Sequence, residues 1–123
     1  MLVVARTIAV VGLSANRFRP SNGVARYLLD AGYKVIPVNP QEGEVLGQRC
    51  YARLEDIPEP VDIVNVFRQP EHVPEVVESA IRIGARGVWL QEGVVHEAAA
   101  AAARAAGLKV VMDLCILNEH RER

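Results

Sequence analysis

A glycine, a serine hydroxyl and two arginines follow the first apolar run of the chain. The run Ile8–Val11 leads into Gly12 and Ser14, and Arg17 and Arg19 come next. Glycine allows a tight turn and a close approach of a ligand to the backbone. The first N–H groups of a helix have no partner within it and attract anions, while arginine adds a full charge and a forked donor. These residues predict a site for a phosphorylated ligand.

The spacing of this segment departs from two common phosphate-binding motifs. In the dinucleotide pattern G-x-G-x-x-G, Gly12 fills the first position, but Ser14 and Arg17 stand in the second and third. That pattern also expects an acidic residue after the second strand, where this chain has Asn39. No Gly-Lys-Ser/Thr follows Gly12, so the P-loop pattern fails. The motif therefore argues against NAD as the ligand without eliminating it.

Composition limits the classes of protein to consider. The chain has 123 residues, half of them apolar, and a formal net charge of −1. We expect one domain, 1–123, no nucleic-acid binding, no membrane span and a cytoplasmic location. The two cysteines, Cys50 and Cys115, are far apart and form no disulfide framework or metal-ligand spacing. No pair of histidines has ligand spacing either, so we expect no metal site.

Apolar runs of strand length alternate with helical patterns along the chain. The predicted strands are residues 7–11, 33–38, 61–66, 87–90 and 109–112. Apolar stripes at helical spacing predict helices near 24–31, 73–81 and 96–106, each followed by a glycine. Prolines and glycines break up residues 39–60, which predict an irregular crossover with one helical turn at 54–57. The alternation predicts an α/β fold: a single-domain, Rossmann-like, doubly wound parallel sheet of about five strands in the order 3-2-1-4-5.

Polar residues follow each predicted strand. In such sheets ligands bind outside the carboxyl ends of the strands, where the strand order reverses. The segments at these ends are Gly12–Ser14, Asn39–Gln41, Phe67–Gln69, Gln91–Val94 and Asp113–Cys115. We therefore expect these loops to build one ligand site together.

Several segments resemble a known family when they are taken together and in order. They are Val11-Gly12-Leu13-Ser14 with Arg19-Pro20-Ser21, residues 32–40, Val61–Val64 with Phe67-Arg68, Trp89–Val94, and Val111–Cys115. This combination resembles the small stand-alone CoA-binding domain proteins, which are similar to the amino-terminal CoA-binding domain of the succinyl-CoA synthetase α subunit. The resemblance covers almost the whole chain. It implies a Rossmann-like domain that holds CoA through its ADP portion. It does not imply synthetase activity, because 123 residues leave no room for the phosphohistidine and nucleotide-grasp domains.

The resemblance and the predicted loop positions also imply a set of CoA-binding residues. The pyrophosphate is expected over the glycine turn and the helix start, with the two arginines on the phosphates. Asn39 and Pro40 are expected at the ribose or adenine, Phe67 and Arg68 as a stacking face for adenine, and Gln91 to Val94 on the pantetheine path. The predicted set is Gly12, Leu13, Ser14, Arg17, Arg19, Pro20, Ser21, Asn39, Pro40, Phe67, Arg68, Gln91 and Gly93.

Catalytic chemistry has weaker support in the sequence. Cys115, Glu119 and His120 could form a Cys-His-acid set, but His120 lies in a charged tail that we expect to be mobile. We therefore predict no catalytic residue. The predicted function is a non-catalytic module that binds CoA or an acyl-CoA as a carrier, sensor or partner subunit. The alternatives are an NAD(P)-dependent reductase or a thiol-dependent acyl-CoA transferase, and a protein partner or a homo-oligomer stays open.

Overall fold

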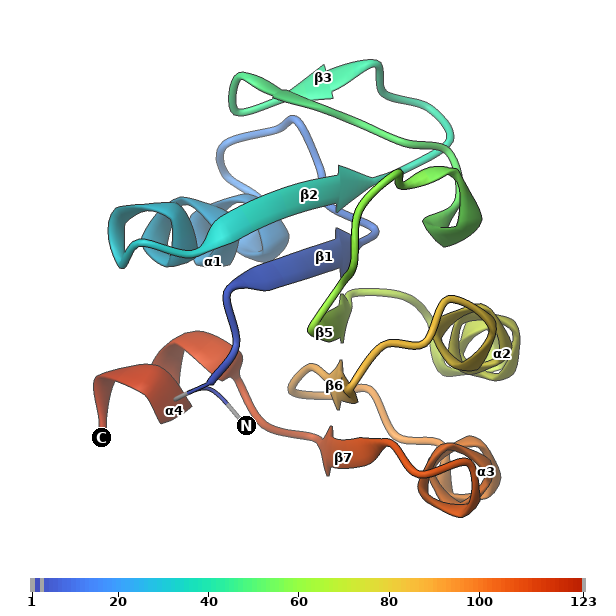
Figure 1. The fold of residues 1–123 in the computed structure, drawn as a ribbon. Coiled ribbons are helices and arrows are strands. Elements are labelled where there is room, and N and C mark those ends of the chain that lie inside the picture. The colour runs from blue at the N-terminus through green and yellow to red at the C-terminus, as the bar shows by residue number, and fades with distance from the viewer. Residues whose placement is uncertain (1, 3, 123) are drawn as a thin grey trace.

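The computed structural model describes residue 2 and residues 4–122. One parallel sheet has the order β2-β1-β5-β6-β7. Its strands are β1 (Thr7–Val11), β2 (Lys34–Val38), β5 (Ile63–Val66), β6 (Gly87–Leu90) and β7 (Lys109–Met112). Helices α1 (Pro20–Asp30) and α4 (Ile116–Arg121) cover one face, and α2 (Val73–Arg82) and α3 (Glu97–Ala105) cover the other (Figure 1). The predicted α/β, Rossmann-like fold is confirmed.

The strand order differs from the predicted 3-2-1-4-5. The third strand of the sheet, β5, pairs with β1 and not with β2, which makes β2 an edge strand. Pro37 lies within β2 and has no N–H to donate, and proline in a sheet is confined to edges and bulges. At the outer side of β2, Tyr51 forms an isolated bridge with Val38, and its N–H donates to the Pro37 carbonyl at 3.0 Å. The predicted order was wrong because it placed this proline in a central strand.

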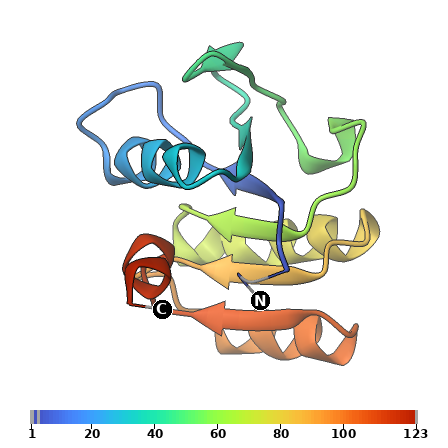
Figure 2. The same ribbon diagram turned by 60° about the vertical axis from the view of Figure 1, so that its left-hand side comes forward.

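The direction of the crossovers explains why the helices divide between the two faces. From β1 to β2 the chain moves toward the sheet edge, and from β2 to β5 it moves back past β1. Right-handed connections then place α1 on one face and the later crossovers on the other. The carboxyl ends of β1, β5, β6 and β7 lie on the same side of the molecule, as their arrowheads show (Figure 2).

The crossover of residues 39–60 is more ordered than the sequence predicts. It contains an antiparallel hairpin of β3 (Glu44–Val45) and β4 (Gln48–Arg49), which was not predicted. The hairpin turn uses Leu46 and Gly47, both with positive φ. The predicted helical turn at 54–57 is confirmed as the 3-10 helix η1 (Leu54–Asp56). This segment brings η1 against α2 on the second face of the sheet.

Alternating strand residues divide the core into two layers. Ile8 and Val10 of β1 pack with the apolar side of α1 and with α4, while Ala9 and Val11 face α2 and α3. The alanine side chains of α3 let it lie close to the sheet, and His96 caps it by accepting a bond from the Ala99 N–H at 3.0 Å. Among the described residues, no helix has the length and apolar character needed to span a membrane.

The carboxyl-terminal segment is a packed helix and not the mobile tail that the sequence predicts. Ile116 at the start of α4 is fully buried in the α1 layer. Near the helix end, His120 Nδ1 lies 2.6 Å from the hydroxyl of Tyr27 on α1. The ring of Tyr33 packs edge-on against the same histidine. That prediction was wrong because these contacts join residues far apart in sequence.

A carboxylate holds the amino end of β1 in the sheet. Asp62 Oδ2 accepts hydrogen bonds from the backbone N–H groups of Arg6 at 2.9 Å and Thr7 at 3.0 Å. Its Oδ1 lies 3.7 Å from Arg86 Nε. Burial alone raises the pKa of Asp62, but the hydrogen bonds from Thr7 and Arg6 and the nearby Arg86 charge outweigh it. The net pKa is lowered from 3.8.

This lowered pKa predicts a loss of stability in acid. A carboxylate whose pKa is lower in the folded than in the unfolded chain stabilises the fold above the unfolded pKa, and the gain disappears as the pH falls through the folded pKa. We expect Asp62→Ala to lower the free energy of unfolding by about 2 kcal/mol at neutral pH. Urea denaturation measured from about pH 7 to about pH 3 checks this. The variant should lose less stability over that range than the parent.

Glu122→Gln removes an exposed carboxylate and is the matched control. It should behave like the parent at both ends of the range. If the free energy of unfolding of Asp62→Ala fell as much on acidification as that of the parent, other carboxylates would account for the loss.

Candidate functional site

The loops after β1 and β5 part at the point where the strand order reverses. Their backbones first run close together, and Gly12 has a φ of +86°. A Cβ at this position would lie 2.3 Å from the carbonyl oxygen of Phe67. A side chain there would therefore be strained by its φ and would also push the two loops apart. From this point the loop after β1 leads to α1 and the loop after β5 leads to α2, on opposite faces of the sheet.

The segment after Gly12 is held by its own side chains. Ser14 Oγ accepts a hydrogen bond from the Asn16 N–H at 3.1 Å, and Asn16 Oδ1 accepts one from the Phe18 N–H at 2.9 Å. The Asn16 carbonyl also accepts from the Arg19 N–H at 3.0 Å. Asn16 was not among the predicted site residues, although asparagine in a loop is a recognised turn-forming residue. These bonds fix where the loop meets α1.

Two residues in the first turn of α1 bind back to this loop. Ser21 Oγ accepts from the Ser14 N–H at 3.1 Å, and Asn22 Nδ2 donates to the Ser14 carbonyl at 2.9 Å. The N-cap residue, Arg19, makes no side-chain cap. No acceptor for the Ser21 N–H lies in the part of the chain that the structure describes. The helix therefore begins with an unfilled donor and the positive end of its dipole.

A first pocket of about 320 Å³ lies at this helix start. It is lined by Gly12, Ser14, Arg19, Pro20, Ser21 and Phe67. All six belong to the predicted site, and the fold brings them together from the loop after β1, the start of α1 and the loop after β5. We call this the helix-start pocket. Its donors are a backbone N–H, hydroxyls and one guanidinium, a set that suits a phosphate group.

A second pocket of about 400 Å³ lies beside the first and shares Phe67 with it. We call it the β6 pocket, because it is lined by residues 67–70 and 91–94. Gly93 donates its N–H to Asp113 Oδ1 at 2.7 Å, which fixes the turn after β6. The buried Gln91 side chain accepts from the Ile116 N–H at 3.0 Å. Gln91 therefore anchors α4 through its side chain as well as bordering the pocket.

Four predicted site residues lie outside both pockets. The Leu13 side chain is fully buried in the core. Arg17 is exposed, with its guanidinium 5.8 Å from the ring centre of Phe18, and Pro40 is exposed as well. Asn39 Nδ2 donates to the Leu13 carbonyl at 3.1 Å, so this amide positions the loop after β1. A ligand role for each of the four stays a prediction.

The two thiols lie in different surroundings, with Cys50 buried and Cys115 half-buried. The Nδ1 of His120 is bound to the Tyr27 hydroxyl, and Cys115 lies at the start of α4. Cys50 is buried, with its Sγ 3.4 Å from the Asn39 carbonyl oxygen. Burial is the main cause that raises the pKa of Cys50. A raised pKa leaves less thiolate at neutral pH, which makes a poor nucleophile.

The fold and this arrangement of loops agree with a comparison against known families. Residues 6–121 match the family described as CoA binding domain. The chain belongs to this family. The match covers nearly all of the sequence, and it confirms the resemblance predicted from the motifs.

Individual proteins and solved structures are similar to most of the chain. Uncharacterized protein YneT of Bacillus subtilis is 44% identical over 115 residues, which are 94% of this chain and 85% of YneT. A hypothetical protein from Pyrococcus horikoshii is 41% identical, with a TM-score of 0.96 over 98% of this chain and 85% of its own. The ADP-forming acetate–CoA ligase II of Archaeoglobus fulgidus is 31% identical over 84 residues. These are 67% of this chain and 12% of the ligase.

The close contact at Gly12 predicts a graded series of glycine substitutions. Gly43→Ala meets neither a positive φ nor a neighbouring atom, and Gly93→Ala meets only the φ of +85°. Gly12→Ala meets the positive φ and the Phe67 carbonyl together. We expect almost no loss of stability for Gly43→Ala, about 1–2 kcal/mol for Gly93→Ala, and more than that for Gly12→Ala. Urea denaturation of the three variants measures the series. If Gly93→Ala and Gly12→Ala lowered the free energy of unfolding equally, the loops after β1 and β5 could move apart without any loss of stability.

Proposed function

We propose that this member of the CoA binding domain family binds CoA or an acyl-CoA through its nucleotide half. The observation that carries the proposal is the helix-start pocket, where the open N-terminus of α1, Ser21 and Arg19 face the Gly12 turn. The pyrophosphate lies in this pocket, because its oxygens match the backbone and hydroxyl donors and its charge matches the guanidinium.

The pantetheine arm lies in the neighbouring β6 pocket. The two pockets meet at Phe67, so a ligand whose pyrophosphate fills the first can continue into the second. The β6 pocket includes one cation, Arg68, and one carboxylate, Glu92. With one positive and one negative side chain, the β6 pocket suits the pantetheine arm, which is polar but uncharged.

We propose a binding module that acts as a carrier, sensor or partner subunit. An NAD(P)-dependent reductase has less support, because Asn39 stands where a ribose-binding carboxylate is expected and its Nδ2 is bound to the Leu13 carbonyl. A thiol-dependent acyl transferase has less support because His120 is hydrogen bonded to Tyr27, and the buried Cys50 has a raised pKa.

Titration calorimetry with CoA, ADP, free pantetheine and NAD tests this proposal. We expect CoA to bind most tightly, ADP to bind detectably, and pantetheine to bind hardly at all, because the nucleotide half makes the charged contacts. NAD should bind more weakly than CoA. If pantetheine and CoA bound equally well, the nucleotide half would contribute nothing and the proposal would be wrong.

The charge of Arg19 predicts a salt dependence of CoA binding. Exposed charges are screened with a Debye length of about 8 Å at physiological ionic strength, so the affinity should fall as salt rises. We expect Arg19→Ala to weaken CoA binding about fivefold at low salt and to flatten the dependence on salt. Calorimetry at about 0.02 M and 0.5 M salt measures both effects. Arg104→Ala, an exposed arginine on α3, is the matched control and should keep the parent's salt dependence. An unchanged slope in Arg19→Ala would assign the phosphate charge to another residue.

A further inference from the structure

The two edges of the sheet differ in how they are protected. An edge strand exposes unpaired N–H and C=O groups that can pair with another chain, and proteins usually block them. At the β2 edge, Pro37 has no N–H to donate and Tyr51 bridges the outer side. The β7 edge, Lys109–Met112, contains no proline, and within residues 4–122 it pairs only with β6 (Figure 1). The β7 edge is therefore open to a further strand.

The outward backbone groups of the β7 edge belong to Val110 and Met112. On the inner side, the N–H groups of Lys109 and Asp113 donate to carbonyls on the β6 side at 3.0 and 2.9 Å. Backbone groups alternate between the two sides of a strand, so those of Val110 and Met112 point away from β6. The side chains of Val110, Val111 and Met112 are apolar but only half-buried. The edge thus offers both hydrogen-bonding groups and apolar surface.

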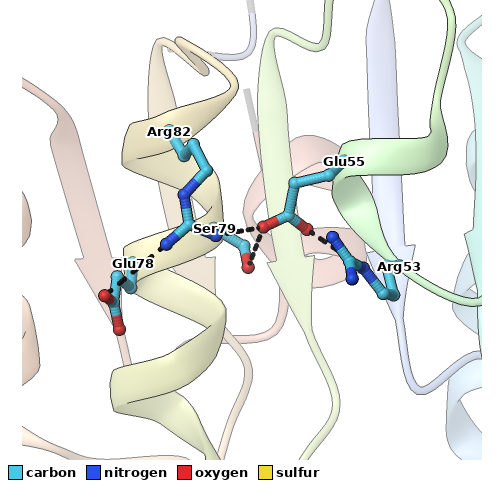
Figure 3. Close-up of polar contacts among 5 residues, drawn as sticks. All are labelled: Arg53, Glu55, Glu78, Ser79 and Arg82. Atoms are coloured by element: carbon cyan, nitrogen blue, oxygen red, sulfur yellow. Dashed lines mark hydrogen bonds and ion pairs between the residues drawn. The ribbon is translucent and has the colours of Figure 1, made fainter.

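Two opposite charges stand at the ends of the β7 edge. Lys109 begins the strand and Asp113 directly follows it, and neither forms an ion pair within residues 4–122. Charged groups on the α2 side have partners within the chain, since Glu55 lies between Arg53 and Arg82 and engages both (Figure 3). A strand with opposite charges at its two ends complements a copy of itself that runs antiparallel.

Helix α3 has the same charge pattern along one flank. Ala98 and Ala102 line a groove toward α2, so the opposite flank of α3 faces past the β7 edge. Glu97, Ala101 and Arg104 have the helical spacing that places them together on that flank. Glu97 and Arg104 are exposed and form no ion pair among the described residues. An antiparallel second α3 would bring each of these charges to an opposite one, with a small alanine between them.

We propose that two copies of this chain join their β7 edges as antiparallel strands about a two-fold axis at Val111, which makes one continuous sheet. In this register, Val110 of each copy exchanges two backbone hydrogen bonds with the partner's Met112, and Val111 faces the partner's Val111. Lys109 then lies opposite the partner's Asp113 at both ends of the pairing. The two α3 helices lie side by side on one face, where alanine permits the axial separation of about 8–10 Å that packed helices have.

A second copy suits this edge because the edge is complementary to itself. An interface with two-fold symmetry uses the same patch twice, so a residue that faces another must also be faced by it. The pairs Lys109 with Asp113 and Glu97 with Arg104 both meet this condition. The same symmetry turns the carboxyl ends of the two sheets in opposite directions. The two helix-start pockets then lie at opposite ends of the joined sheet, so this proposal does not depend on CoA binding.

Sedimentation velocity of the full chain tests the association. We expect a concentration-dependent species with twice the 13.5 kDa mass of one chain. Lys109→Glu places a carboxylate opposite Asp113 at each end of the pairing, and it should raise the Kd of the dimer about tenfold. Lys34→Glu is the matched control, because Lys34 is the other lysine of the chain and begins the opposite edge strand. It should keep the parent's Kd.

A rescue variant separates the charge pair from a general loss of fold. Asp113→Asn added to Lys109→Glu removes the repulsion and keeps a side-chain oxygen for the Gly93 N–H. We expect the double variant to recover part of the dimer affinity that Lys109→Glu loses. Circular dichroism checks that each variant keeps the parent's fold.

Cross-linking tests the register. Val111 faces its own copy as a non-hydrogen-bonded pair, whose Cα atoms lie about 4.5 Å apart, within the range that a disulfide spans. We expect Val111→Cys to form a disulfide-linked dimer under mild oxidation, measured on a non-reducing gel. Val110→Cys, which faces Met112 in this register, and Ala98→Cys, an exposed position on the α2 flank of α3, should cross-link much less. The parent controls for Cys50 and Cys115.

Each outcome bears on the proposal. A parent that sediments as a monomer at every concentration overturns it. A dimer with the same Kd in the parent and in Lys109→Glu would use another surface, and the proposal would be wrong. If Val110→Cys cross-links as fully as Val111→Cys, the register is wrong. Support comes from a weakened dimer in Lys109→Glu, its recovery with Asp113→Asn, and cross-linking of Val111→Cys above all its controls.

Discussion

Two backbones touch at the point where the strand order reverses, with Gly12 against the carbonyl of Phe67. This contact sets how far apart the loops after β1 and β5 stand. The helix-start pocket and the β6 pocket both include Phe67. The two loops cannot close further here, and a side chain on Gly12 would force them apart. Together with the Phe67 N–H, which donates to the Val11 carbonyl at 2.9 Å, this close approach holds the two pockets side by side.

The fold class could be predicted from sequence because it depends on local patterns. Strand-length apolar runs and helix-length stripes alternate, and this alternation leaves few architectures. The strand order depends instead on which edges pair over long distances. Pro37 was a local signal for an edge strand, since it cannot donate a ladder hydrogen bond, but the predicted order did not use it. The start of α4 gave no comparable signal, because Ile116 is buried by contacts with residues distant in sequence.

The candidate site shows a different limit. Residue type predicted which loops meet, and the six residues of the helix-start pocket all came from that list. Type alone does not tell whether a side chain has already used its hydrogen bonds inside the protein. Asn39 and Gln91 are polar and lie at strand ends, yet each binds a backbone group of its own chain. The pairing of Glu55 with Ser79 and Arg82 was missed because the partners are 24 and 27 residues away.

The attachment of α4 to the sheet passes through the one tryptophan of the chain. Trp89 on β6 is 4% exposed, and its indole N–H donates to the Leu114 carbonyl at 2.8 Å, directly before α4. Indole emission shifts to longer wavelength when water reaches the ring. The protein therefore carries a native optical probe at this junction. Its fluorescence reports whether the carboxyl-terminal segment is docked, separately from the bulk helix content that circular dichroism records.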